Sequence, residues 1–152
     1  IRPRIIDWLK DHSISVKTYG KGWPSSEVSP QDMNAIYSRS LINLGFGFIG
    51  NSFLTGLKGR DFEVPLMGGL YLTTYNQELE KHFTIGEEID CYRNEAELLA
   101  KLYYYMTHPD VALKIGASGR MRCLRDHTWI NRFQISLNMM NISDHTSEMS
   151  HG

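Results

Sequence analysis

The sequence predicts an α/β domain with a mainly parallel sheet flanked by helices. Short apolar runs of strand length alternate along the chain with amphipathic stretches of helical spacing. The run Leu41–Leu44 is of the kind found in parallel sheets, where both faces of a strand are buried. A length of 152 residues is that of one domain with a single core.

The first part of the chain predicts a helix, a strand and a second helix. Apolar residues at helical spacing over Arg4–His12 give a helix with one buried side. Residues 14–19 alternate with period two, which predicts a strand. The second helix starts at Ser29 as its cap, because Pro30 suits a first turn and Asp32 favours the positive helix end. Its expected buried face consists of Met33, Ile36 and Tyr37.

In the middle of the chain, strands are expected at 41–44 and 70–74, each followed by a helix. The loop after the first strand contains five of the thirteen glycines, namely Gly45, Gly47, Gly50, Gly56 and Gly59. A helix over 60–67 follows, in which Pro65 fits only near the start, because a proline deep inside would break it. A short helix over 76–83 follows the second strand.

The last part of the chain predicts one strand, at 89–92, and then helices only. Asn94 and Glu97 resemble a capping box that opens a long helix over 94–107. The broad apolar face of this helix is expected to be well buried: Leu98, Leu99, Leu102, Tyr105 and Met106. Further helix starts are expected at Pro109 and Thr128. The domain is expected to cover residues 1–140 and the polar residues 141–152 to form a flexible tail.

Composition excludes several classes of function. The formal charge is −1, from 16 basic and 17 acidic residues, and no basic cluster indicates nucleic-acid binding. No apolar run approaches the ~20 residues that span a bilayer, and we expect no signal peptide at the start of the chain. Cys91 and Cys123 are far apart, so we expect buried free thiols and a cytoplasmic protein. Because the chain begins at Ile1 without Met, we expect it to be a fragment.

The glycine-rich loop is a candidate phosphate site. A loop between a strand and a helix offers backbone N–H groups and the positive end of a helix to a diphosphate. Lys58 and Arg60 at the end of the loop could neutralise its charge, or they could simply be solvated. The glycine spacing fits neither a Walker loop nor the dinucleotide fingerprint.

Acidic residues follow the loop. Glu63 could accept hydrogen bonds from both hydroxyls of a ribose, or it could only complement the helix dipole. Asp61 and Glu63 could alternatively chelate a metal, but residues two apart on a helix do not share a face, so no metal is expected. His127, at a junction between helices, is expected to be structural rather than catalytic.

Several motifs in order resemble the CgeB-like glycosyltransferases, named after a spore-maturation protein. Lys58–Gly69 resembles their Arg-x-Phe-Glu … Gly-Gly segment, and Leu72–Glu80 and Gly86–Asn94 continue the match. Asp126–Trp129 resembles the end of that family's domain. The resemblance implies a Rossmann-like fold, the C-terminal half of a GT-B glycosyltransferase, with the N-terminal half and the first strand lying before Ile1.

The resemblance also implies roles for individual residues. Lys58 and Arg60 would stabilise the leaving diphosphate, and Glu63 would hold the ribose. Thr55 occupies a position where many relatives have a glutamate, which puts a carboxylate contact to the sugar in doubt. The nucleotide-sugar site implied in this way comprises Glu63, Thr55, Gly56, Gly59, Asn43, Val28 and Trp23.

The expected function is therefore binding of a nucleoside-diphosphate sugar for transfer of its glycosyl group to a saccharide, lipid or protein acceptor. No permanently bound cofactor is expected, and the fragment alone is expected to be inactive. The alternatives are a degenerate binding module that has lost activity, an epimerase of nucleotide sugars with the same fold, and a receiver-type signalling domain. The last would need an acidic cluster at the strand ends, where this chain has Gly and Asn.

Overall fold

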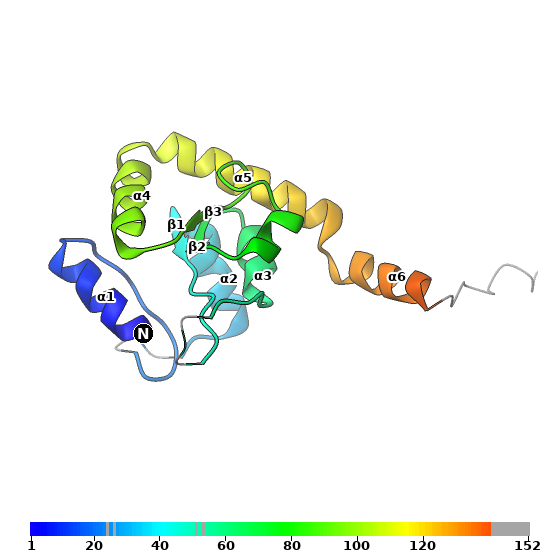
Figure 1. Cartoon of the computed structure of the whole chain (residues 1–152), viewed down its shortest axis with the longest axis horizontal. Helices are drawn as coiled ribbons and strands as arrows, with labels where there is room; N and C mark the ends of the chain where they lie inside the picture. The colour runs from blue at the N-terminus through cyan, green and yellow to red at the C-terminus, as the bar shows by residue number, and fades with distance from the viewer. Residues whose placement is uncertain (24, 26, 51, 53, 141–152) are drawn as a thin grey trace, which may run out of the picture.

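A three-stranded parallel sheet lies at the centre of the domain (Figure 1). The computed structural model describes residues 1–23, 25, 27–50, 52 and 54–140, so the expected tail lies outside the described residues. The strands are β1 (Ile42–Leu44), β2 (Leu70–Thr74) and β3 (Asp90–Tyr92), in the order β1-β2-β3. The predicted α/β class and parallel sheet are confirmed.

Helices account for most of the remaining chain. They are α1 (Arg2–Asp11), α2 (Pro30–Arg39), α3 (Arg60–Leu66), the 3₁₀ helix η1 (Gln77–Lys81), α4 (Glu95–Thr107), α5 (Pro109–Asp126) and α6 (Trp129–Met139). The predicted caps are confirmed, because the side chains of Ser29, Asn94 and Thr128 each accept a hydrogen bond from the backbone N–H three residues on. None of the helices in the described part of the chain could cross a membrane.

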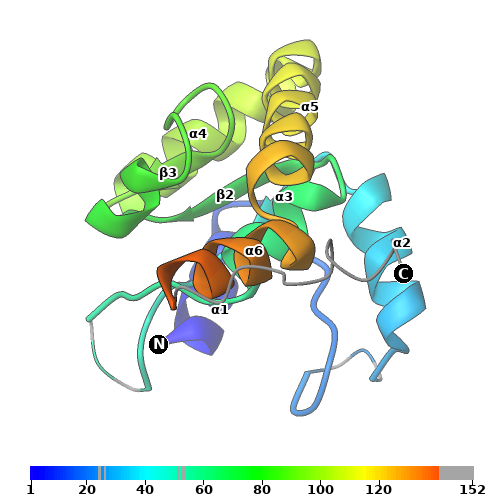
Figure 2. The same ribbon diagram turned by 90° about the vertical axis from the view of Figure 1, so that its right-hand side faces the viewer.

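The central strand β2 is buried along its whole length because helices pack on both of its faces. Leu72 packs into a cluster with Ile5 of α1 and Leu98 of α4. Its neighbour Tyr71 points the other way, into a cluster that contains Val64 of α3. The sheet thus separates α1 and α4 from α3. The helix α3 packs against β2 (Figure 2).

Two glycines of α5 allow this helix to lie against backbone. A Cβ atom on Gly116 would lie 2.4 Å from the carbonyl oxygen of Gly68, just before β2. A Cβ atom on Gly119 would lie 2.1 Å from the carbonyl oxygen of Glu88, just before β3. Neither backbone oxygen can move aside as a flexible side chain would. These glycines are therefore required by the close approach of α5 to the two loops.

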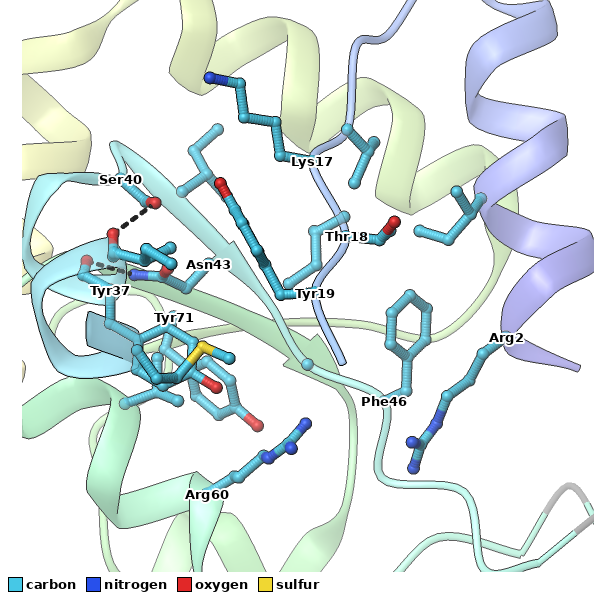
Figure 3. Close-up of a pocket in the computed structure, with 18 of the residues that line it drawn as sticks. Arg2, Lys17, Thr18, Tyr19, Tyr37, Ser40, Asn43, Phe46, Arg60 and Tyr71 are labelled. Atoms are coloured by element: carbon cyan, nitrogen blue, oxygen red, sulfur yellow. Dashed lines mark hydrogen bonds between the residues drawn. The ribbon is translucent and has the colours of Figure 1, made fainter. Parts of the chain in front are cut away.

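The predicted strand at 14–19 is wrong. Residues 14–18 form no strand, and Tyr19 makes only an isolated bridge with Ser25. The segment does not pair with β1, whose only strand neighbour among the described residues is β2. Period-two alternation is present, but a strand also needs a partner for its backbone groups, and a cavity lies between this segment and β1 (Figure 3).

Two other predictions need smaller corrections. The segment 76–83 contains a short 3₁₀ helix rather than an α-helix. Pro65 does not lie near the start of α3 but one residue before its end. A proline there removes only the hydrogen bond to the carbonyl of Asp61, and the helix stops at once, so the disruption is small.

Burial is also less complete than predicted on two helices. None of the residues of α2 is fully buried, because Met33, Ile36 and Tyr37 line the cavity instead of a closed core. On α4, Met106 is half exposed while Leu98 and Leu102 are buried. The helix α6 extends away from the rest of the domain (Figure 1) and exposes most of its large apolar side chains.

Candidate functional site

A cavity of about 820 Å³ opens beside β1. Its walls are the extended segment 14–19, the strand β1, one side of α2 and the beginning of α3 (Figure 3). Most of the wall is apolar, but charged side chains gather near Phe46, which follows the carboxyl end of β1. Carboxyl ends of parallel strands are where α/β sheets bind ligands, so this end of the cavity is the candidate site.

Lys58 lies in the wall of this cavity and holds the glycine-rich loop. Its Nζ atom donates hydrogen bonds to the carbonyl oxygens of Phe46 at 3.2 Å and Phe48 at 2.6 Å. Burial, followed by the nearby charges of Arg2 and Arg60, lowers the pKa of Lys58 below its ordinary value. An ammonium group has three protons, so Lys58 can bind the loop and still direct a positive charge at a ligand.

Arg60 starts α3 and its side chain projects into the same cavity (Figure 3). The structure shows no ion pair for Arg60 with any described residue. The same holds for Glu63, one turn later, which also lines the cavity and is exposed. A Cβ atom on Gly59 would lie 3.2 Å from Oε1 of Glu63, so this carboxylate lies directly over the start of α3. Both side chains are thus available to a ligand.

Asp61 lies between Arg60 and Glu63 in the sequence and has a different role. It is 3% exposed, and its Oδ1 accepts a 2.7 Å hydrogen bond from the hydroxyl of Tyr71 on β2. Its Oδ2 accepts a 2.7 Å hydrogen bond from the backbone N–H of Lys58. Burial and the charge of Asp61 raise the pKa of Tyr71 well above its usual range. Asp61 therefore fixes the start of α3 to the sheet and so positions Lys58 and Arg60.

The burial of Asp61 also bears on the alternative of a metal site. Its carboxylate faces the core, whereas the carboxylate of Glu63 faces the cavity, so the two do not converge on one point. Among the residues that the structure describes, no group of three or more His, Cys, Asp or Glu side chains could hold a metal ion.

The glycine-rich loop uses many of its own amides. Gly45 donates to the carbonyl of Leu72 at 2.8 Å, and Gly47 donates to Oγ1 of Thr74 at 2.7 Å. Gly56 donates to the carbonyl of Gly47 at 3.1 Å. The expectation that glycines here offer unhindered N–H groups is therefore wrong for these three residues. They are needed instead for close packing, since a Cβ on Gly45 would lie 2.4 Å from the hydroxyl oxygen of Tyr71.

Backbone N–H groups without a partner occur at the end of the loop. Within the described part of the chain, the amides of Gly59 and Arg60 donate no hydrogen bond, because they precede the first full turn of α3. They lie in the cavity wall together with the side chains of Lys58 and Arg60.

Two residues of the predicted nucleotide-sugar site already have partners in the fold. The side-chain amide of Asn43 donates to the carbonyl of Tyr37 at 3.0 Å, although Asn43 does line the cavity. The hydroxyl of Thr55 donates to the carbonyl of Tyr75 at 3.3 Å, and Thr55 does not line the cavity. Their roles toward a ligand stay predictions.

Of the two residues expected to bind the base, only Trp23 lines the cavity. Trp23 lines the cavity and is half-buried against the core cluster that contains Ile5 and Leu72. Val28 is also half-buried but does not line the cavity. Sequence reasoning missed Arg2, Lys17 and Tyr19, all of which line the cavity. Spacing along the chain gives no signal for them, because only the fold brings their segments to β1.

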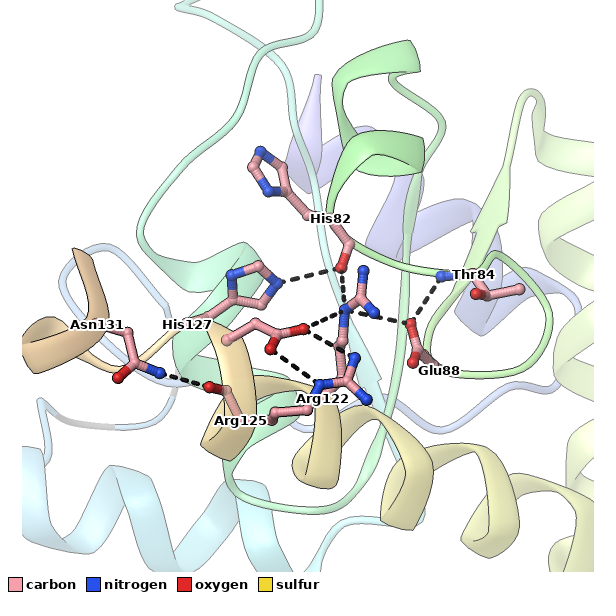
Figure 4. Close-up of polar contacts among 8 residues, drawn as sticks. His82, Thr84, Glu88, Arg122, Arg125, His127 and Asn131 are labelled. Carbon is pink, nitrogen blue, oxygen red and sulfur yellow. Dashed lines mark hydrogen bonds and ion pairs between the residues drawn. The ribbon is translucent and has the colours of Figure 1, made fainter. Parts of the chain in front are cut away.

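The junction between α5 and α6 supports a structural role for His127 (Figure 4). Its Nε2 lies 3.1 Å from the carbonyl oxygen of His82, which also accepts a 2.8 Å hydrogen bond from Arg122. Arg122 forms further ion pairs with Asp126 at 3.2 Å and Glu88 at 3.8 Å. These contacts tie the end of α5 to the loops before β3.

Comparisons with known proteins agree with this fold. The chain matches the model of a family described as glycosyl transferase-like over residues 2–138. Its structure resembles sucrose-phosphate synthase from Thermosynechococcus elongatus with a TM-score of 0.64 and 14% sequence identity. The similarity covers 93% of this chain and 35% of that protein, so the chain spans about a third of its length.

No curated protein sequence matches the chain. A likeness at 14% identity concerns the fold, while the family model matches nearly the whole chain in sequence. The fold is that of a fragment of a GT-B glycosyltransferase, and the chain belongs to the glycosyl transferase-like family.

Proposed function

We propose that this domain binds the nucleoside-diphosphate sugar donor of a CgeB-like glycosyltransferase. The observation that carries the proposal is the meeting of Lys58, Arg60 and Glu63 in one cavity at the carboxyl end of β1. Two cations and one acidic side chain, each able to face a ligand, suit a diphosphate joined to a ribose. The family membership supports transfer of a glycosyl group as the reaction.

The difficulty in glycosyl transfer is negative charge that grows on the departing diphosphate. Arg60 can donate two parallel hydrogen bonds to phosphate oxygens, and Lys58 adds a second positive charge from a partly buried position. The free amides of Gly59 and Arg60 lie beside them. The backbone that carries these groups is held in place before the reaction, because Asp61 fixes the start of α3. Leaving-group stabilisation of this kind needs no permanently bound cofactor.

The rest of the donor would extend from the diphosphate along the cavity. Our proposal assigns to Glu63, which lines the cavity, the acceptance of hydrogen bonds from the ribose hydroxyls. Trp23 offers an aromatic face to the base and Asn43 lines the same cavity, while Val28, which does not line it, stays assigned to the base from the family resemblance. Gly56 and Thr55 belong to the glycine-rich loop but do not line the cavity, and our proposal assigns them to the sugar.

The acceptor and the catalytic base belong to a part of the enzyme outside this chain in our proposal. The sucrose-phosphate synthase is much longer than the chain, which leaves room for a second domain in a related enzyme. We assign a saccharide, lipid or protein acceptor to that domain and a cytoplasmic location to the whole protein. The isolated domain would then bind the donor without transferring the sugar.

A degenerate binding module is the second candidate function. The observation that favours it is Thr55, whose hydroxyl is engaged by the carbonyl of Tyr75 at a position where many CgeB-like proteins have a glutamate. Such a module would bind the donor through the same cavity but would not transfer the sugar in any longer form of the protein. Transfer assays on a longer form therefore separate the two candidates.

The test of donor binding is titration calorimetry with UDP, GDP, ADP and TDP and their sugars at up to millimolar concentration. Replacing Glu63 by Gln removes the charge that would hold the ribose. Hydrogen bonds to a charged group are worth about 1.5–3 kcal/mol, so affinity should fall roughly tenfold or more. Glu87→Gln is the matched control, because Glu87 is exposed and does not line the cavity. Equal affinities of E63Q and the parent would exclude the ribose role.

The same titrations test the diphosphate position. Arg60→Ala should weaken the binding of a nucleoside diphosphate much more than that of the bare nucleoside, because only the diphosphate presents phosphate oxygens to the guanidinium. Equal losses for both ligands would mean that Arg60 acts by shaping the cavity.

A further inference from the structure

We infer that Arg2 is a third ligand of the donor diphosphate, so that α1 and α3 hold this group from two sides of the cavity. This inference rests on the proposed function and names a residue that neither the sequence motifs nor the family match points to. Arg2 is the first residue of α1, whereas Lys58 and Arg60 come from the loop before α3 and from its first turn.

The position of Arg2 is the first support. Its side chain lines the same cavity as Lys58 and Arg60. Figure 3 shows the side chains of Arg2 and Arg60 projecting from opposite walls toward the space below Phe46. That space lies directly after the carboxyl end of β1, where the proposed diphosphate would sit.

The lack of a counter-charge is the second support. Arg4, two residues further along α1, forms an ion pair with Glu95 at the start of α4. In the structure described, Arg2 forms no such pair, nor does Arg60. Asp61, the buried carboxylate that follows Arg60 in the sequence, is already engaged by Tyr71 and by the amide of Lys58. Two guanidinium groups therefore face one cavity without an acidic partner.

The charges around the cavity are unbalanced. Among the described residues its wall holds the cations Arg2, Lys17, Lys58 and Arg60 and a single acidic residue, Glu63. Burial and then the positive charge of Arg2 lower the pKa of Lys58; Asp61 partly offsets this, and Arg60 lowers the pKa further, so the three cations repel one another. Like charges held together destabilise the unliganded state, and a bound anion would remove that repulsion.

The chemistry of the ligand follows from this arrangement. A diphosphate has two charged groups and can accept hydrogen bonds from two guanidinium forks, whereas a monophosphate has only one. A cavity with cations on both sides should therefore discriminate between the two classes. We expect Arg2 to make the site selective for nucleoside diphosphates over nucleoside monophosphates.

The experiment compares Arg2→Ala with Arg4→Ala by titration calorimetry. Arg4→Ala is the matched control, because it removes the same side chain from the same helix but from an ion pair outside the cavity. The probes are UDP, GDP, ADP and TDP, the corresponding monophosphates and nucleosides, and inorganic pyrophosphate. The expected result for R2A is an affinity for diphosphates and pyrophosphate about tenfold lower, with nucleoside affinity unchanged, and R4A should bind like the parent.

The conservative variant Arg2→Lys tests charge against shape. It should recover part of the lost diphosphate affinity, because the positive charge returns without the forked geometry. Thermal denaturation of R2A, R2K and R4A shows whether each is folded; since Arg2 is exposed, we expect parental stability.

The outcomes separate the inference from the proposed function. If the parent binds diphosphates and R2A binds them equally well, the role of Arg2 is refuted while the donor site stands. If R2A loses affinity for diphosphates and for nucleosides to the same degree, Arg2 supports the fold of the cavity and is not a ligand. If the parent binds none of the nucleotides or pyrophosphate, both the donor site and the role of Arg2 fail.

Discussion

The hydrogen bond between Tyr71 and Asp61 offers the sharpest test of how the candidate site is held in place. Replacing Tyr71 by Phe removes only the hydroxyl that donates 2.7 Å to Oδ1 of Asp61. The ring can stay in the cluster between β2 and α3. Because Asp61 is 3% exposed, water cannot easily replace the missing donor.

The size of the effect follows from the charge and burial of Asp61. A hydrogen bond to a charged group contributes about 1.5–3 kcal/mol, and a buried acceptor left without a donor lies toward the upper part of that range. For a domain of this size, each kcal/mol shifts Tm by roughly 2–4 °C. We therefore expect Tyr71→Phe to lower Tm by about 3–12 °C.

The assay is thermal denaturation followed by circular dichroism or calorimetry, with Tyr75→Phe as the matched control. Tyr75 directly follows β2, and its hydroxyl also donates to a carboxylate, that of Glu80 at 2.8 Å. That pair is exposed, so solvent can take over the hydrogen bond, and no clear change in Tm is expected for Tyr75→Phe.

Equal shifts for the two variants would refute the reasoning, because burial of the acceptor would then not matter. A large loss for Tyr71→Phe should also weaken binding of a nucleoside diphosphate, since Lys58 and Arg60 depend on Asp61 for their position. Unchanged diphosphate affinity in a folded but destabilised variant would limit Asp61 to a purely stabilising role.

Two further predictions concern the packing around β2 and β3. Gly119→Ala should lower Tm by about 2–12 °C, because the new Cβ would lie 2.1 Å from a backbone oxygen and overpacking costs about 1–3 kcal/mol. Thermal denaturation measures this shift, with Lys114→Ala, at an exposed position on the same helix, as the control. An unchanged Tm for G119A would mean that α5 can move away from the loop. Cys91 and Cys123 should not react with a thiol reagent in the native protein, because burial raises the pKa of each thiol to about 12. Both should react after unfolding in urea, and rapid reaction before unfolding would contradict the described core.

Features set by neighbouring residues could be predicted from the sequence. The strands at 70–74 and 89–92 and the cap at Ser29 depend on local periodicity and on side-chain hydrogen bonds within one turn. The segment 14–19 could not be predicted in this way. Its alternation is local, but a strand exists only where a distant segment supplies hydrogen bonds, and β1 does not pair with it.

The candidate site shows the same division. One short stretch of sequence contains Lys58, Arg60 and Glu63, so a motif could indicate them together. All three line one cavity. Arg2 is far away in sequence and reaches the cavity only because α1 packs beside β1. The hydrogen-bond partners of the loop amides could likewise not be predicted from the sequence, because Gly45 and Gly47 donate to residues on β2.

The unpaired side of β1 has a practical consequence for every binding measurement on this chain. In the described structure this strand bonds to β2 on one side only, and the other side borders an apolar cavity wall. An open strand of this kind is a template on which a second polypeptide can lengthen the sheet. Segment 14–19 and α2 stand across the cavity from that side of β1, so a second polypeptide would have to enter the cavity to pair with it. Nucleotide titrations are therefore best run dilute, with light scattering to confirm that monomers remain.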